Sequence, residues 1–229
     1  MQRAFGLSIP ETVADVCDPA RLALLVYDMQ VGVMRQLPAP DAAAITALVA
    51  AVLAAAREGG YRVFFTRHMS LPNEVAGVAQ LRMAMAWQRV KDVRQVRPAF
   101  LRDSAGFQLV PELAPRPSEA IFDKIAMSAF VGTPLEQALR DAGILAVAFV
   151  GVALEVGIEP AVRHAADLGF IPVLVTDACG GRDQEAQRRT LASLAFAGDA
   201  MLTDAGTVCD LFRLAKPARA RSSATPPAR

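Results

Sequence analysis

The sequence has little net charge and few cysteines, and it lacks a paired-cysteine motif. Its 229 residues carry a formal net charge of +1, which gives no reason to expect nucleic acid or an anionic membrane as a partner. Cys17, Cys179 and Cys209 form neither a C-x-x-C motif nor a disulfide framework, so we expect a cytoplasmic location. We find no secretory leader, and no apolar run approaches the ~20 residues that cross a bilayer.

Metal ligands and recognisable nucleophiles are also scarce. His68 and His164 are the only histidines, whereas zinc and iron sites usually join two or three histidines or carboxylates. His164 is expected inside a helix, where convergence with other ligands is unfavourable, so we predict no metal and no other cofactor. Cys179 has no evident base beside it, and Ser70 and Ser128 lack the G-x-S-x-G turn of serine hydrolases.

Apolar residues are abundant and make up 53% of the chain, which is enough for a large core. We expect one domain at residues 1–215, followed by a disordered Pro- and Arg-rich tail at 216–229. Apolar runs predict strands at Arg21–Tyr27, Tyr61–Thr66, Ala120–Phe122, Ile144–Val150, Phe170–Thr176 and Ala200–Leu202. Helices are predicted at Ala42–Glu58, from Pro134 to near Gly143, and at Leu154–Leu168, Asp183–Ala197 and Asp204–Leu214.

Alternating strands and helices predict an α/β fold, with a parallel sheet covered by helices on both faces. Asp41 and Thr133 are the expected caps of two of these helices. Residues 1–20 look irregular, with room for one short helix. Residues 69–118 are the least regular part, and they form either a lid or pocket wall, or a surface excursion packed by its own methionines and tryptophan.

Four candidate site elements directly follow apolar strands: Asp28, His68, Lys124 and the turn Gly151–Gly157. In doubly wound sheets the site lies beyond the carboxyl ends of the strands, so we expect all four at one edge. Asp28 could exchange protons with a substrate, or it could merely accept backbone N–H bonds. Lys124 could orient Asp28, hold a substrate anion, or be a solvated strand end.

The stretch Phe149–His164 passes from an apolar strand through Gly151 into a predicted helix. The first N–H groups of a helix lack intrahelical partners, so such a place suits an anion or developing negative charge. Many enzymes carry a nucleophile on this kind of turn. This chain has Gly157 where that side chain is expected.

Five ordered blocks of sequence resemble the isochorismatase-like hydrolases, a superfamily that includes nicotinamidases and N-carbamoylsarcosine amidohydrolases. The blocks are LLVYDMQVGV, FFTRH, DKIAMSAF, VGVALEVGIEPAVRHAADLGF and VTDACGG, between Arg21 and about Leu211. The resemblance implies a three-layer α/β/α, doubly wound, Rossmann-like fold with a six-stranded, mainly parallel sheet. It also implies a homo-oligomer, either a dimer or a tetramer, and a non-proline cis peptide between Val152 and Ala153.

Most of this superfamily uses an Asp–Lys–Cys triad, and the resemblance assigns the first two members to Asp28 and Lys124. Gly157 occupies the cysteine's position, so the chemistry of a thiol acyl-enzyme does not transfer. Isochorismatases proper also have glycine there. In them the aspartate protonates a vinyl ether carbon, and water then completes cleavage to pyruvate and a dihydrodiol.

Residues outside these blocks align less well with the family. The segment LAPRPSEAIFDKIAMSAF is most similar to the phenazine-pathway type of isochorismatase. His68 falls where those enzymes carry a polar substrate-binding side chain of another type. The 69–97 segment does not allow their binding arginine to be transferred, which leaves Arg82 and Arg89 as candidates. The nicotinamidase metal pattern of an aspartate with two nearby histidines is absent.

Three functions remain open from the sequence. The first is cleavage of a small carboxylated substrate, such as the vinyl ether of isochorismate, by Asp28 and water. The second is water attack on a small amide or ureide, and the third is ligand binding without catalysis. We predict Asp28 and Lys124 as catalytic residues, and as substrate-binding residues His68, Arg82, Trp87, Ser128, Val152, Ala153 and Gly157.

Overall fold

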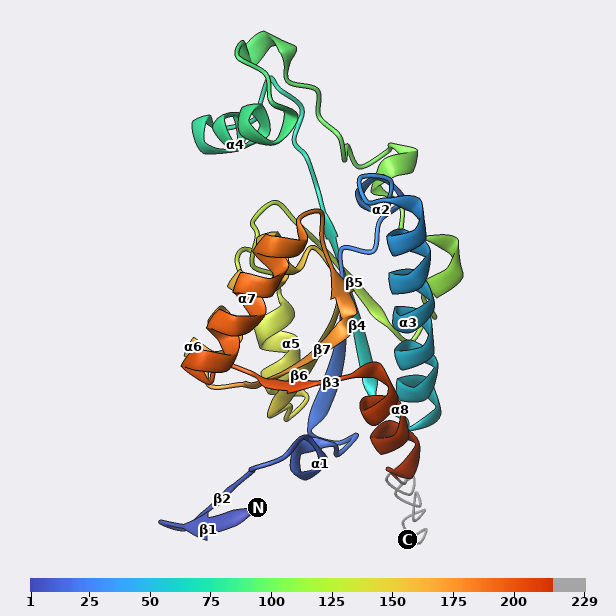
Figure 1. The fold of residues 1–229 in the computed structure, drawn as a ribbon, viewed down its shortest axis with the longest axis vertical. Helices are drawn as coiled ribbons and strands as arrows, with labels where there is room; N and C mark the ends of the chain where they lie inside the picture. The colour runs from blue at the N-terminus through green and yellow to red at the C-terminus, as the bar shows by residue number, and fades with distance from the viewer. Residues whose placement is uncertain (216–229) are drawn as a thin grey trace, which may run out of the picture.

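A six-stranded parallel sheet forms the centre of the molecule in the computed structural model, which describes residues 1–215 (Figure 1). The strand order is β5-β4-β3-β6-β7-β8, and every neighbouring pair is parallel. The predicted α/β class and six strands are therefore confirmed, while the predicted tail at 216–229 lies outside the described residues. The strands are β3 (Leu22–Tyr27), β4 (Arg62–His68), β5 (Ala120–Lys124), β6 (Ala146–Val152), β7 (Ile171–Gly180) and β8 (Met201–Thr203).

Helices cover both faces of this sheet and give the predicted three layers (Figure 1). Two of them, α3 (Ala39–Glu58) and α8 (Ala205–Leu214), share one apolar core with one face of the sheet. On the other face, a second apolar core joins the sheet to α5 (Leu135–Asp141), α6 (Glu159–Asp167) and α7 (Gln184–Ala197). All six residues of β3 are buried, as its continuous apolar run predicts for a strand covered on both sides.

Helices α3 and α5 do not begin at the residues predicted from the sequence. The long helix α3 begins at Ala39 and not at Ala42, so the prediction that Asp41 caps it is wrong. Pro40 explains the shift, because a proline in the first turn has no N–H to leave unpaired. Helix α5 begins at Leu135, and the hydroxyl of Thr133 accepts a hydrogen bond from the Leu135 N–H at 3.2 Å, so Thr133 does stabilise this start.

The predicted helix Leu154–Leu168 is divided into two segments. Residues Leu154–Ile158 form a π-helical turn, and the α-helix proper, α6, begins only at Glu159. Pro160 lies in the first turn of α6, the position at which a helix tolerates it. The peptide between Val152 and Ala153 is cis, as the resemblance implies.

Two regions predicted to be irregular contain regular structure. Residues 1–20 include a hairpin of β1 (Gln2–Ala4) and β2 (Leu7–Ile9), followed by the short helix α1 (Val13–Val16). The 69–118 segment contains α4 (Val78–Gln88), which buries none of its residues. Figure 1 shows α4 standing clear of the sheet, at the end of the segments that lead out from β4 and return to β5. We call residues 69–100 the excursion.

Helix α3 is long and apolar enough to cross a membrane by length and composition alone. The prediction that no apolar run approaches this length is therefore wrong for Ala39–Glu58. The helix packs its buried residues, among them Val49, Val52 and Leu53, into the core beneath the sheet. An apolar helix with this packing has the pattern of a core helix.

The strand order reverses between β3 and β6. These two strands lie side by side although helices and two other strands separate them in sequence. Tyr27 pairs with Gly151 at this switch point. Gly151 has a φ of +119°, and a Cβ there would lie 2.2 Å from the Tyr27 carbonyl oxygen, so only glycine fits. Next to them, His68 of β4 pairs with Lys124 of β5, which brings both side chains to the carboxyl edge of the sheet.

Candidate active site

A buried ion pair between Asp28 and Lys124 lies at the carboxyl edge of the sheet. Lys124 Nζ is 2.7 Å from Asp28 Oδ2, and the exposed fractions of the two side chains are 1% and 9% respectively. Lys124 also donates a hydrogen bond to the carbonyl oxygen of Ala126 at 3.3 Å. A buried pair of this geometry compensates charges that neither partner could carry alone in an apolar core.

Thr66 fixes the second oxygen of Asp28. Its hydroxyl donates to Asp28 Oδ1 at 2.7 Å, and it also lies 3.2 Å from the Asp28 backbone N–H. Asp28 itself has a φ of +47°, a left-handed conformation that aspartate tolerates better than most residues. Such backbone strain, about 1–3 kcal/mol, persists where surrounding contacts determine it. Asp28 is therefore held rigidly, with its carboxylate aimed in one direction.

Gln30 joins Asp28's segment to the end of β4. This fully buried amide accepts a hydrogen bond from the His68 backbone N–H at 2.7 Å. It donates to the carbonyl oxygens of His68 and Phe107 at 3.1 and 2.9 Å. The amide therefore fixes the backbone on which His68 is presented.

His68 stays neutral at ordinary pH. Burial lowers its pKa from 6.5 to about 4, and the charge of Lys124 acts in the same direction against the opposing charge of Asp28. Its ring makes edge-on contacts with Trp87 and Phe100, at centroid distances of 6.4 and 6.0 Å. His68 can therefore offer a neutral imidazole to a substrate in an aromatic setting.

This pKa predicts a specific acid sensitivity. An unfolded chain takes up a proton on His68 near pH 6.5, whereas the folded protein resists it to about pH 4. The contribution of His68 to the free energy of unfolding is therefore fully present above pH 6.5. It falls by on the order of 2 to 3 kcal/mol as the pH drops to 4. Denaturant titrations across this range should show a shallower fall in His68→Gln than in wild type. Equal slopes in the two proteins would contradict the burial of a neutral histidine.

A cavity of about 390 Å³ opens above Asp28, a size typical of small-molecule sites. Its wall includes most of the residues predicted for the site. Lys124 is not part of this wall and contacts Asp28 from beneath. The predicted site residues that line the cavity are Asp28, His68, Trp87, Val152, Ala153 and Gly157.

Two predicted substrate-binding residues lie elsewhere. Arg82 is an exposed residue of α4 and lines neither this cavity nor its neighbour. Ser128 is buried, and its hydroxyl lies 3.0 Å from His164 Nδ1, so it serves the packing of the loop after β5. Cys179 is also buried, its thiol donates to the Phe149 carbonyl, and burial raises its pKa, which leaves it unsuited to nucleophilic attack.

The helix start after β6 offers fewer free N–H groups than the sequence predicts. The N–H groups of Val156, Gly157 and Ile158 all point back to the Ala153 carbonyl oxygen, at 3.2, 2.9 and 3.1 Å. They are therefore not available to an anion. The side chain of Glu155, which also lines the cavity, adds a carboxylate to this wall. The predicted anion-binding turn is therefore wrong for Gly157.

Several wall residues were not identified from sequence. Arg182 follows β7 at the same edge and is the one cationic side chain among the cavity's lining residues; the edge rule that found Asp28 could have found it. Phe100 and Met127 come from loops without a periodic pattern, and no sequence signal marks them. Among residues 1–215, no group of three or more histidine, cysteine or acidic side chains is placed to hold a metal ion.

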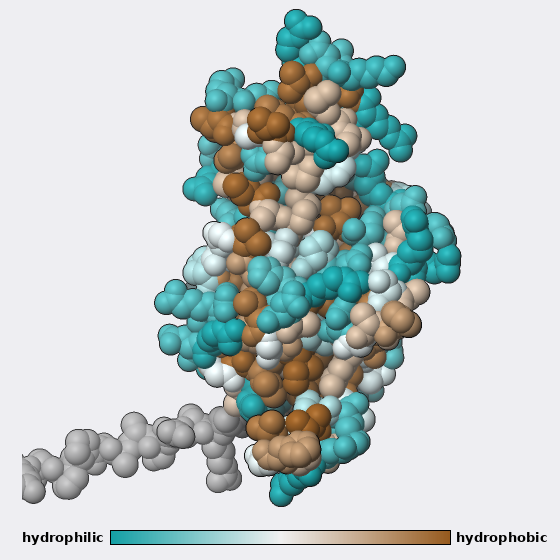
Figure 2. Space-filling model, turned by 90° about the vertical axis from the view of Figure 1, so that its left-hand side faces the viewer, coloured by the Kyte–Doolittle hydropathy of each residue, from teal (hydrophilic) through white to brown (hydrophobic). Residues whose placement is uncertain are grey.

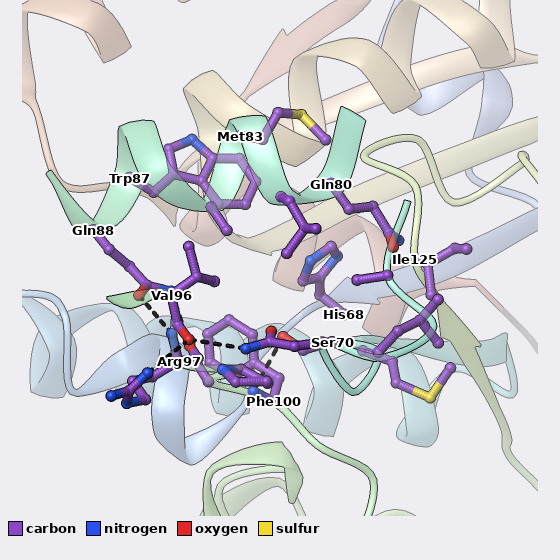
Figure 3. A pocket seen from close by; sticks show the side chains of 18 of the residues that line it. His68, Ser70, Gln80, Met83, Trp87, Gln88, Val96, Arg97, Phe100 and Ile125 are labelled. Atoms are coloured by element: carbon purple, nitrogen blue, oxygen red, sulfur yellow. Dashed lines mark hydrogen bonds between the residues drawn. The ribbon is translucent and has the colours of Figure 1, made fainter. Parts of the chain in front are cut away.

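A second, smaller cavity of about 80 Å³ lies between α4 and the ends of β4 and β5 (Figure 3). Figure 3 shows Trp87 and Met83 on one side and His68 and Phe100 on the other. Trp87, His68 and Phe100 also line the larger cavity, so they separate the two spaces. The excursion thus supplies a wall of the site, the first of the two alternatives left open from the sequence.

The parallel α/β fold, the polar groups that converge at its switch point and the matching domain model together define a hydrolase. The chain belongs to the isochorismatase-like hydrolase family, because residues 22–206 match the model of the isochorismatase domain. The superfamily predicted from sequence is thereby confirmed.

Solved structures agree with the fold. A cysteine hydrolase from Pseudomonas syringae pv. phaseolicola 1448A superposes with a TM-score of 0.74 at 23% identity, over 86% of this chain and 95% of its own. An isochorismatase family protein from Burkholderia thailandensis gives 0.68 at 24% identity, covering 84% and 96%. For N-carbamoylsarcosine amidase from Thermoplasma acidophilum the values are 0.67 at 20% identity, with 81% and 96% covered. Similarity at these identities establishes a common architecture.

Proposed function

We propose that the protein hydrolyses a small carboxylated substrate of the isochorismate type, using Asp28 and water without a covalent intermediate. One observation carries this proposal: Asp28, held by Lys124 at 2.7 Å, faces a cavity that has Gly157 where a nucleophile would stand. Of residues 1–215, those that line this cavity include no cysteine and no serine. The protein must then activate the substrate or water directly.

The proposed reaction starts from Asp28 after its carboxylate has taken up a proton from water in the cavity, and Asp28 gives this proton to the terminal methylene carbon of the vinyl ether. The resulting oxocarbenium ion is attacked by water, which returns a proton to Asp28. The hemiketal then breaks the bond between its central carbon and the ether oxygen that is attached to the ring. The proton of its hydroxyl group passes to that oxygen, and pyruvate and a dihydrodiol are released. One water is consumed and Asp28 ends in its starting state, so no cofactor enters the balance.

The shape of the cavity supports a substrate with a ring. A volume of about 390 Å³ exceeds what a small amide needs, and the lining is mainly apolar, with Phe100, Trp87 and Met127 among its residues. Arg182 is positioned on the wall to pair with one carboxylate. His68, neutral and beside Trp87, can share a hydrogen bond with a hydroxyl or carbonyl oxygen.

A direct assay tests the proposal. Purified protein is supplied with isochorismate, and pyruvate is followed by a coupled reduction to lactate; the proposal expects steady release. In parallel, a panel of small amides and ureides is tested for ammonia. Ammonia without pyruvate would replace the proposal with a water-dependent amidohydrolase. Neither product, together with thermal stabilisation by small acids, would identify a binding protein.

We also propose a cytoplasmic location and a homo-oligomeric state, either dimer or tetramer. Cys17, Cys179 and Cys209 are free thiols, as a reducing compartment requires. The excursion exposes Val75, Val78 and Trp87, and Figure 2 shows apolar side chains gathered on the upper part of the molecule, where the excursion lies. Apolar surface of this kind is commonly covered by another subunit.

A further inference from the structure

Gly157 is not required by its own backbone. It lacks the positive φ that would favour glycine, so the chain could accept an ordinary residue there. The obstacle is a single side chain. A Cβ at 157 would lie 2.8 Å from Cε1 of Tyr27 and 3.6 Å from Cδ1 and Cζ of the same ring, and these are its three nearest atoms. Any side chain at 157 therefore requires the ring of Tyr27 to move.

The ring of Tyr27 is held in place from several sides. The residue is fully buried, and its hydroxyl donates a hydrogen bond to the carbonyl oxygen of Met127. Its backbone is paired with Gly151 at the switch point, where strands β3 and β6 approach closely. Burial raises the pKa of the phenol, so it remains a neutral donor. Because the backbone is fixed, making room at 157 would require the buried ring itself to shift and its hydrogen bond to Met127 to break.

Tyr27 also contacts the catalytic pair. Lys124 Nζ lies over its ring, 4.6 Å from the centroid, in a cation–π arrangement. The Lys124 side chain is 1% exposed and does not line the cavity, so it reaches the substrate only through Asp28. The aromatic face is one of the groups that shield the buried ammonium group from water. Tyr27 thereby favours the two hydrogen bonds that Lys124 does make, to Asp28 Oδ2 and to the Ala126 carbonyl oxygen.

We infer that Tyr27 selects the chemistry of this site, by occupying the space that a nucleophile at 157 would need and by positioning Lys124 against Asp28. The ring is thus the reason that the site works with glycine and water. This inference deepens the proposed function and rests on it for the kinetic part, but the steric part concerns the fold alone. Tyr27 is a positioning residue, since it lies behind the cavity wall.

The steric part is tested by a double-mutant cycle on thermal stability. Gly157→Ala adds only a Cβ and should lower the melting temperature by about 4–8 °C in the wild-type background. In the Tyr27→Leu background the same substitution should cost less than half of that, because alanine is otherwise better than glycine in a helical turn. Tyr27→Phe keeps the ring and is the matched control, with the same loss as wild type. Equal losses in all three backgrounds would overturn the inference.

The positioning part is tested by kinetics on the substrate that the protein turns over. Tyr27→Leu should lower kcat about tenfold, because Lys124 loses its aromatic partner, while KM stays within about twofold of wild type because the ring lies outside the cavity. Tyr27→Phe should retain wild-type kcat. Equal kcat in Tyr27→Leu and wild type, or equal losses in both variants, would overturn the positioning role. A wild-type protein inactive on every substrate would instead reject the proposed function and leave the stability cycle to decide the steric role.

Discussion

Asp28→Asn is expected to lower kcat by about 10²- to 10⁴-fold, the range that a positioned proton donor or base contributes. The substitution keeps the size of the side chain but removes its negative charge and its ability to exchange a proton. Thr66 and Lys124 each donate to one oxygen of the native carboxylate, at 2.7 Å in both cases, so the amide group of asparagine opposes one donor. Steady-state kinetics on isochorismate, with substrate affinity measured separately by calorimetry, would show the effect.

The matched control for this experiment is Thr66→Val, which removes the hydroxyl hydrogen bond but leaves the carboxylate in place. It should reduce kcat far less than Asp28→Asn, since the proton-exchanging group survives. Unaltered turnover in Asp28→Asn, in a protein shown to be folded by circular dichroism, would reject Asp28 as the acid and base of the reaction.

Lys124→Met is expected to destabilise the fold by about 3–5 kcal/mol, because it leaves the Asp28 carboxylate buried without its charged partner. Methionine has nearly the same length as lysine and fills the space beneath Asp28 against the Tyr27 ring. The loss is therefore one of charge and hydrogen bonding and not of packing. Urea unfolding, followed by tryptophan fluorescence of Trp87 and by circular dichroism, would measure it.

The double variant Asp28→Asn/Lys124→Met provides the control for this prediction. With the carboxylate also neutralised, no unpaired charge remains buried, so much of the lost stability should return. If instead the two single losses simply add in the double variant, the pair does not act as a buried ion pair. The arrangement at 2.7 Å would then contribute to catalysis but little to stability.

The edge of the sheet that holds the candidate site could be predicted from the sequence, because all strands of a parallel sheet point the same way. A polar residue that ends a buried strand must lie at the carboxyl edge, and this rule predicts that Asp28, His68 and Lys124 lie together. It did not identify Thr66, although Thr66 also lies near the end of such a strand. The face of the strand on which a side chain lies decides its contacts, and an error of one residue in the predicted register changes that face.

Residues beyond the sheet were harder to predict. Arg82 and Trp87 both belong to α4, yet only Trp87 reaches the cavity, because the two side chains point to different sides of the helix. Helix α4 itself was not predicted, since it buries no residue and so has no apolar stripe for sequence reasoning to recognise. Ser128 fell within a matching block, but its hydroxyl turns away to His164.

The effect of Tyr27 on position 157 could not be predicted from the sequence for a different reason. Its apolar neighbours in β3 made it look like one more core residue, and its burial agrees with that. Its effect on position 157 depends on two strands and a turn meeting at the switch point, a contact between residues more than a hundred positions apart in the chain. Local pattern carries no information about such a contact.

The excursion separates two properties that most enzymes must change together. Trp87 and Phe100 shape the cavity, yet α4 contributes nothing to the two apolar cores that stabilise the sheet. Substitutions in α4 are therefore expected to alter which substrates fit with little effect on the two apolar cores or on Asp28 and Lys124. Substrate range in this protein can therefore evolve, or be engineered, at the residues of α4, none of which is buried.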